Sequence, residues 1–152
     1  MVINMIYIVI IIFLIIDIIS KLIVSRVCTL NNSVSVINNF FSITYTHNYG
    51  GAWSLFSDST ILITVISIIV IIGIIIYLSK KKINNKIESL GYAFLLGGAI
   101  GNLIDRIIYG YVIDFLDFNI FGYNFPIFNI ADMGIVIGIF LIIVIEIRGN
   151  KK

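Results

Sequence analysis

Four long runs of apolar residues, separated by more polar segments, dominate the chain. A helix needs about 20 mostly apolar residues to cross the hydrocarbon core of a bilayer. We therefore expect four transmembrane helices, at about residues 2–24, 59–78, 87–108 and 129–147. The first run has no basic residue before it and no Ala-x-Ala sequence after it. This favours a retained helix over a cleaved signal peptide.

The two longer links between these runs differ in pattern. In the first, Ser33–Ile37 alternates polar and apolar residues, and Phe40–Tyr45 is aromatic and β-branched, with pairs of asparagines as turn signals. This pattern predicts a small hairpin or curved sheet lying on the membrane surface. The link at 109–128 mixes aromatic residues with two glycines and a proline, so we expect an interfacial loop there.

Composition narrows the class of protein. Hydrophobic residues make up 60% of the chain and charged residues 12%, and the mean hydropathy is +1.12, whereas a soluble domain carries about 25% charged residues. The predicted fold class is an all-α integral membrane protein with a small β-containing segment between helices 1 and 2, and with 1–152 as one domain. A net charge of +2 is too small to indicate a nucleic-acid-binding protein.

The basic residues predict how the chain is oriented in the membrane. The link at 80–86 holds four lysines, and the tail at 148–152 holds one arginine and two lysines. The links at 25–58 and 109–128 hold only Arg26 between them. Because lysine and arginine favour the cytoplasmic side, we expect both termini and the lysine-rich link to be cytoplasmic.

On this topology, the polar residues at the helix ends and in the outer links map to the extracytoplasmic side. An ionisable residue within a transmembrane segment costs about 2.5–3.5 kcal/mol on insertion scales, so such residues are candidates for function. The residues that share this side are Asp17, Lys21, Asn48, Gly50, Asn102, Asp105, Arg106, Asp114, Asp117, Asn129 and Asp132.

Some of these residues have a structural interpretation. Asp17 and Lys21 are four residues apart on one helical face and can pair, so mutual neutralisation is an equal alternative to a functional role. Asp105 and Arg106 are adjacent in sequence and point to different sides of their helix. Each is expected to reach a partner elsewhere, and a structural clamp is the favoured interpretation.

Asp114 and Asp132 have no obvious basic neighbour in the sequence. Two carboxylates held close together cannot both ionise cheaply, so such a pair shares a proton. One can take a proton from water while the other donates to a carbonyl oxygen, which hydrolyses an amide without a metal or a nucleophilic side chain. From spacing alone, a proton relay in a transporter or channel is supported nearly as well.

Other functions are less well supported. A conducting path needs polar residues along the depth of the helices, yet the inner halves of the second and fourth runs are almost wholly apolar. A non-enzymatic scaffold would not need clustered acids. His47 is the only histidine and Cys28 the only cysteine, which argues against a metal site, and nothing orients the two as a thiol protease. The glycines at 97–101 are expected to allow close helix packing, and Trp53 to lie in an interfacial aromatic belt.

Four segments, in order along most of the chain, resemble the motifs of one family. Asp17–Lys21 is similar to a D-x-x-S-K element, and Asn48–Ser54 to an N-x-G-x-A-[FW]-S loop. Gly97–Phe115 is similar to a G-G-x-x-G-N-x-x-D-R…G-x-V-x-D-F signature, and Phe128–Asp132 to an F-N-x-A-D element. The family is lipoprotein signal peptidase, or signal peptidase II.

This resemblance implies a bacterial inner-membrane aspartyl endopeptidase with four helices and an extracytoplasmic β-cradle. The family removes the signal peptide from diacylglyceryl-modified prolipoproteins just before the lipidated cysteine, uses no cofactor or metal, and is blocked by globomycin. It would act as a monomer in contact with membrane lipid. The V-x-D-F match selects Asp114 over Asp117.

The resemblance also assigns roles to residues of this chain. Asp114 and Asp132 would be the catalytic pair. The substrate site would be formed by Asn48, Gly50, Asn102, Arg106, Asn129 and Ala131. Asp17, Lys21 and Asp105 would support its shape.

Overall fold

The computed structural model describes residues 2–50 and 59–149. The predicted role of Trp53, and most of the loop motif that follows Asn48, lie outside the described residues. Four helices account for most of the described chain: α1 (Val2–Val27), α2 (Thr60–Lys80), α3 (Lys86–Tyr109) and α4 (Ile130–Gly149). All four are long and apolar enough to cross a membrane. The four predicted helices are therefore confirmed, with ends close to those expected from the apolar runs.

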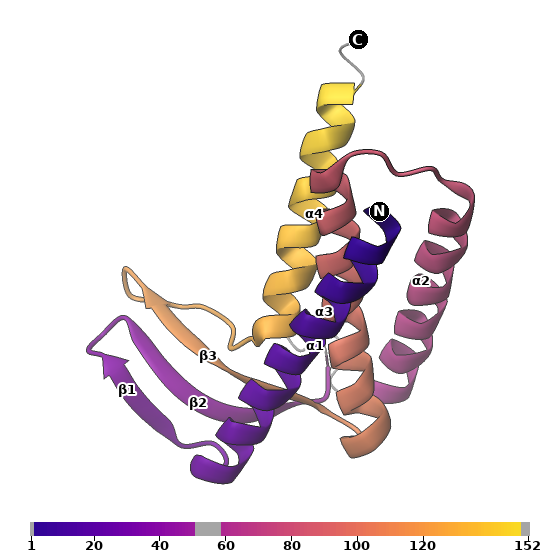
Figure 1. Cartoon of the computed structure of the whole chain (residues 1–152). Coiled ribbons are helices and arrows are strands. Elements are labelled where there is room, and N and C mark those ends of the chain that lie inside the picture. Colours follow the sequence, from indigo (N-terminus) through magenta and orange to yellow (C-terminus); the bar gives the residue numbers. More distant parts are fainter. Residues whose placement is uncertain (1, 51–58, 150–152) are drawn as a thin grey trace.

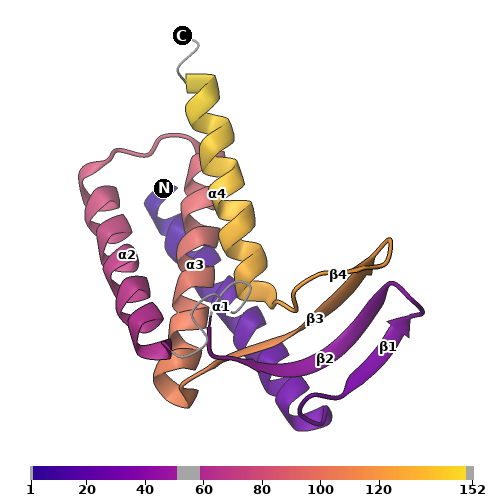
Figure 2. The ribbon, with the colours of Figure 1, turned by 180° about the vertical axis from the view of Figure 1, so that it is seen from behind.

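The helices are arranged around α3, which is the most buried of the four. α1 and α4 pack against α3 and against each other, and α2 packs against α3 from another side (Figure 2). The α3–α4 contact depends on glycine. A Cβ atom at Gly138 would lie 2.6 Å from the carbonyl oxygen of Gly91, and one at Gly98 would overlap the carbonyl oxygen of Ala131. Small residues thus let the two backbones approach closely, as the sequence predicted.

A four-stranded antiparallel sheet extends from one end of the helices. Its strands are β1 (Ser33–Ile37), β2 (Phe41–Asn48), β3 (Val112–Ile120) and β4 (Tyr123–Asn124), in the order β1-β2-β3-β4. The predicted hairpin in the first link is present as β1 and β2.

The link at 109–128 was expected to be an interfacial loop, and the structure places the strands β3 and β4 in it. The description "all-α" therefore omits a sheet that draws strands from both long links. The first four residues of β3 are buried in succession. A stretch that is covered on both faces need not alternate polar and apolar residues, so the start of β3 gave a weaker strand signal than β1.

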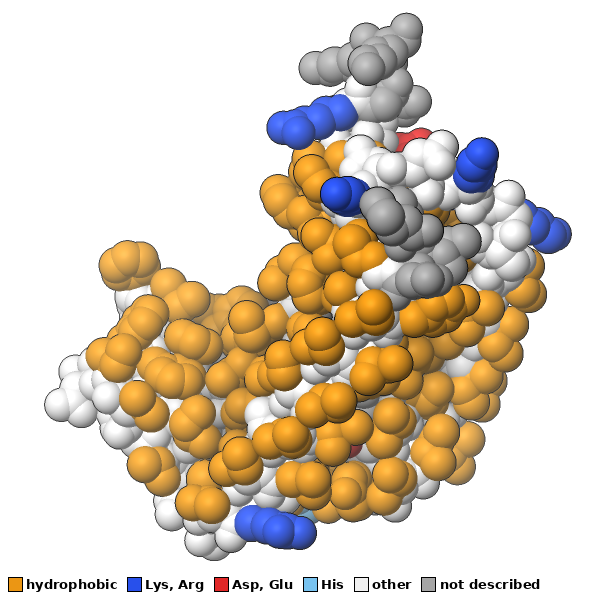
Figure 3. All heavy atoms as spheres, viewed as in Figure 1, with side chains coloured by type: hydrophobic (Ala, Val, Ile, Leu, Met, Phe, Trp, Pro, Cys, Tyr) orange, Lys and Arg blue, Asp and Glu red, His pale blue; other side chains and the backbone are white. Residues whose placement is uncertain are grey.

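The sheet and the lysine-rich link lie at opposite ends of the molecule. The N-terminal end of α1, the C-terminal end of α4 and the α2–α3 link share one end, and the sheet leaves the other (Figure 1). Lysine and arginine side chains gather around the first of these ends, while hydrophobic side chains cover the helices between (Figure 3).

A hydrophobic cluster fixes the base of the sheet against α1. Val24 of α1 packs with Tyr45 of β2 and with Ile113 and Phe115 of β3, and all four are buried. Because side chains alternate along a strand, the residue between Ile113 and Phe115 points to the opposite face. That residue is Asp114.

Candidate active site

Asp114 lies buried near the start of β3, just after the sharp turn that follows α3. Gly110 ends that helix in the left-handed conformation, at φ 79°, which glycine adopts without strain. β3 then begins at Val112. The Asp114 side chain is 2% exposed, and its Oδ2 accepts a hydrogen bond from Nδ2 of Asn48 at 2.8 Å. The backbone N–H of Gly50 donates to Oδ1 of Asn48 at 3.0 Å, which fixes that amide with its N–H groups toward the aspartate.

Asp132 is positioned by the first turn of α4. Asn129 precedes the helix, and its Oδ1 accepts the backbone N–H of Asp132 at 2.9 Å. In return, the backbone N–H of Asn129 donates to Oδ2 of Asp132 at 3.2 Å. This reciprocal pair has the form of a capping box, and the helix dipole favours a carboxylate at such a site. Nδ2 of Asn102 donates to the other oxygen of Asp132 at 2.7 Å.

Asn129 connects the two aspartates. While its side-chain oxygen caps α4, its Nδ2 donates to Oδ1 of Asp114 at 2.6 Å and to Oδ1 of Asn102 at 3.1 Å. The Asn129 side chain is fully buried. One residue therefore holds Asp114 of β3 and Asp132 of α4 in a single polar cluster.

Burial favours the protonated form of Asp114 near neutral pH. Burial raises the pKa of the Asp114 carboxyl to about 7, with repulsion from the Asp132 carboxylate as a second cause. Hydrogen bonds from Asn48 and Asn129 and the positive charge of Lys21 act in the opposite direction but do not offset burial. A carboxyl with this pKa can carry a proton near neutral pH.

A second set of buried residues lies next to the pair. Nζ of Lys21 lies 2.8 Å from Oδ2 of Asp17 and 2.9 Å from Oδ2 of Asp105. The predicted Asp17–Lys21 pair is thus present, and Asp105 joins it. Arg106 points elsewhere, as expected from its position beside Asp105. Its Nη1 donates to the backbone oxygen of Asn102 at 3.3 Å, and its buried Nε has no hydrogen-bond partner among the described residues.

The remaining candidate side chains have other surroundings. Asp117 accepts a hydrogen bond from Thr44 Oγ1 at 2.6 Å, away from the cluster around Asn129. His47 Nε2 forms a hydrogen bond with Tyr45 Oη at 2.9 Å, and its ring stacks on Tyr111. Cys28 packs at the edge of the hydrophobic cluster at the base of the sheet. Within residues 2–50 and 59–149, no group of His, Cys, Asp or Glu side chains is placed to hold a metal ion.

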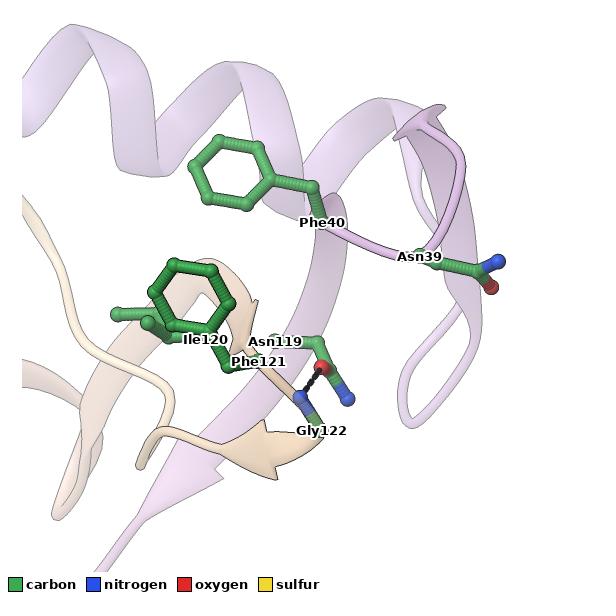
Figure 4. Close-up of a pocket in the computed structure, with 6 residues that line it drawn as sticks. All are labelled: Asn39, Phe40, Asn119, Ile120, Phe121 and Gly122. Carbon is green, nitrogen blue, oxygen red and sulfur yellow. Dashed lines mark hydrogen bonds between the residues drawn. The ribbon is translucent and has the colours of Figure 1, made fainter.

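A hollow also lies at the tips of the two hairpins, at the far end of the sheet from the α3–β3 turn (Figure 4). Its lining consists of Asn39, Phe40, Asn119, Ile120, Phe121 and Gly122. These residues include no acid, base or nucleophile, so the hollow does not offer an alternative centre for hydrolysis.

The structure thus brings the predicted site residues into one polar network, including parts that the sequence did not link. The spacing of Asp17 and Lys21 indicated a pair but not the third member, Asp105. Asn102 and Asp105 are three residues apart on α3 and so share a face; that spacing could have indicated that both reach Lys21. The bridging role of Asn129 depends on β3 and could not be seen before that strand was known.

The comparisons with known proteins agree with one another. A family model described as signal peptidase (SPase) II matches residues 9–148. Lipoprotein signal peptidases of Staphylococcus aureus strains JH9 and Newman are 40% identical over 138 residues, which cover 90% of this chain and 85% of theirs.

Two solved structures have a fold similar to that of this chain. A bacterial membrane enzyme determined by the in meso method at 2.3 Å is 37% identical, with a TM-score of 0.88 over 98% of this chain and 92% of its own. A second, at 1.9 Å, is 37% identical with a TM-score of 0.84 over 93% and 91%. The family model spans most of the chain and the relatives cover more than two thirds of it, so the chain belongs to the signal peptidase II family, the lipoprotein signal peptidases.

Proposed function

We propose that the chain is an aspartyl endopeptidase in which Asp114 and Asp132 together activate a water molecule. The observation that carries the proposal is the bridge through Asn129, which hydrogen-bonds to both carboxyl groups. Two acids held in one buried cluster, with the Asp132 charge raising the pKa of Asp114, are suited to sharing a proton. Membership of the signal peptidase II family makes the reaction a peptide-bond hydrolysis that removes prolipoprotein signal peptides.

The surroundings of the two acids support different roles for them. Asp132 accepts N–H groups from Asn102 and from the backbone at the start of α4, which stabilise a carboxylate. It would take a proton from water as the water oxygen attacks the scissile carbonyl carbon. Asp114, with its pKa near 7, would donate its proton to the carbonyl oxygen. When the tetrahedral intermediate collapses, the C–N bond breaks and Asp132 gives the departing nitrogen the proton that it took from water. The hydroxyl proton of the intermediate returns to Asp114 as the new carboxyl group forms.

Several neighbouring polar groups are suited to bind the peptide being cut. A helical carbonyl is already hydrogen-bonded, so the substrate must be unwound at the scissile bond, and its freed backbone groups need partners. The unpartnered Nε of Arg106 and the amides of Asn48, Asn102 and Asn129 would supply them. Gly50 and Ala131 would border the same site, each through its fixed backbone.

The proposed substrate is a prolipoprotein that already carries a diacylglyceryl group on its lipobox cysteine, cut just before that cysteine. The protein would act as a single 1–152 domain and as a monomer in the bacterial cytoplasmic membrane, with both termini cytoplasmic and the sheet and the aspartates at the extracytoplasmic face. The concentration of lysine and arginine at the end opposite the sheet supports this orientation (Figure 3). Globomycin-type inhibitors would occupy the same site, and no cofactor is needed.

The test uses purified protein in lipid nanodiscs with two synthetic precursor peptides of identical sequence, one with and one without the diacylglyceryl group. Mass spectrometry of the products gives both the rate and the position of cleavage. The proposal expects release of the signal fragment from the lipidated peptide only, with the new amino terminus at the lipidated cysteine. No fragment from either peptide, or a chelator-sensitive reaction, would contradict it.

A further inference from the structure

Lys21 is among the most buried large side chains of the protein, with 2% of its surface exposed. It makes three polar contacts: the ion pairs with Asp17 at 2.8 Å and Asp105 at 2.9 Å, and a hydrogen bond from Nζ to Oδ1 of Asn102 at 3.1 Å. A lysine ammonium has three N–H groups and no acceptor. Two of these contacts are ion pairs and one is a hydrogen bond, so acceptor oxygens from three residues surround the buried ammonium.

One branch of this network leads to Asp132. Oδ1 of Asp17 accepts the backbone N–H of Ala131 at 2.9 Å, and Ala131 is the residue before Asp132. In addition, Lys21 holds the oxygen of the Asn102 amide, which leaves Nδ2 of that amide to donate to Asp132 at 2.7 Å. Lys21 and Asn129 thus both hold the oxygen end of the Asn102 amide, and its N–H groups face Asp132.

The other branch leads to Asp114 in the same manner. Oδ2 of Asp105, the atom that pairs with Lys21, also accepts the backbone N–H of Ile113 at 3.2 Å. Ile113 is the residue before Asp114. Each acid that pairs with Lys21 therefore holds the peptide N–H directly preceding one of the two active-site aspartates.

We propose that Lys21 is a positioning residue that sets the separation and orientation of Asp114 and Asp132. The inference rests on the proposed function and adds to it a role for a side chain that touches neither aspartate directly. Neutralising one acid would require only one partner, whereas Lys21 joins α1 to both aspartate-bearing segments through Asp17 and Asp105. A displacement of about 1 Å in a catalytic group can lower a rate by about 100-fold, so this connection has a measurable consequence.

The test compares two Lys21 variants with a matched control. Lys21→Met removes the charge and all three contacts. Lys21→Arg keeps the charge but replaces a compact ammonium with a larger planar group. The control is Lys81→Met, which removes another short lysine ion pair, to Glu88 at 2.7 Å, on the link between α2 and α3 at the opposite end of the bundle. Steady-state rates are measured on the lipidated precursor peptide, per mole of folded protein in nanodiscs.

We expect Lys21→Met to lower kcat by about 100-fold or more, and Lys21→Arg by about 10-fold, while KM stays within about threefold in both. Lys81→Met should retain the kcat of the parent protein. If Lys21→Met does not accumulate as folded protein, Lys21→Arg decides. A kcat within about twofold of the parent protein in Lys21→Met, or in Lys21→Arg where Lys21→Met does not fold, would overturn the inference.

The pH dependence of kcat separates positioning from simple stabilisation. Asp114 faces Asp132 of α4, Lys21 of α1 and Arg106 of α3, and the Lys21 charge lowers the pKa of Asp114. Lys21→Met should therefore raise the pH at which kcat begins to fall on the alkaline side. Lys21→Arg should leave that pH unchanged and lower the maximal kcat. A loss of activity that only follows the loss of folded protein, with unchanged profiles, would overturn the inference. Failure of the parent protein to cleave the peptide would instead refute the proposed function.

Discussion

Asn129 offers the sharpest separation of structural from chemical effects, because its two side-chain atoms have different tasks. Oδ1 caps α4 through the N–H of Asp132, and Nδ2 donates to Asp114 and Asn102. Asn129→Ser keeps a residue that caps helices well but removes the bridging amide. Asn129→Ala removes both.

The magnitudes follow from these contacts. Asp114 becomes a carboxylate as it gives up its proton, and a hydrogen bond to a charged group contributes about 1.5–3 kcal/mol. Loss of the Asn129 donor should therefore lower kcat roughly 10- to 100-fold in both variants. Loss of the cap costs about 1 kcal/mol more, and this cost falls on Asn129→Ala alone. The two variants should therefore have similar rates and different stabilities.

The assay measures kcat on the lipidated precursor peptide and thermal unfolding in nanodiscs for both variants. We expect equal loss of kcat in the two variants, with Asn129→Ala unfolding at a lower temperature than Asn129→Ser. If Asn129→Ser kept the activity of the parent protein, the amide bridge would not contribute to catalysis. If the rate followed the unfolding temperature across both variants, the effect would be structural.

The remaining predictions concern pH and packing. Because the protonated form of Asp114 is proposed to act as the acid and burial raises its pKa to about 7, kcat should fall as pH rises above about 7; a rate that keeps rising to pH 9 would contradict this role. Gly98→Ala should destabilise the protein by more than about 1 kcal/mol, because the new methyl group meets the backbone of α4. Gly73→Ala, where no atom lies within 4 Å of the new Cβ, should not; equal unfolding temperatures for the two variants would contradict the packing argument.

The helices could be predicted closely because a transmembrane helix satisfies its own backbone and only needs a long apolar run. β1 and β2 could also be predicted from the sequence, because their alternating pattern and their turn residues lie close together along the chain. β3 could not, because its hydrogen bonds are made with β2, far away in the sequence.

The site residues could be named from motifs, but their connections could not. The prediction that Asp105 reaches a partner away from Arg106 agrees with its pairing to Lys21, whereas the identity of that partner required the packing of α1 on α3. The orientation of the Asn102 and Asn129 amides likewise depends on four segments meeting at one point. Such contacts are tertiary and leave no periodicity in the sequence.

The central claim is that Asp114 and Asp132 act as one unit, and the rates of aspartate-to-asparagine variants on the lipidated precursor test it most directly. Asp114→Asn, Asp132→Asn and the double variant should share one residual rate, because residues that act together are not additive. Asp117→Asn, which alters a carboxyl bound to Thr44, should retain most of the activity. An active Asp114→Asn or Asp132→Asn protein, or an inactive Asp117→Asn protein, would contradict the account.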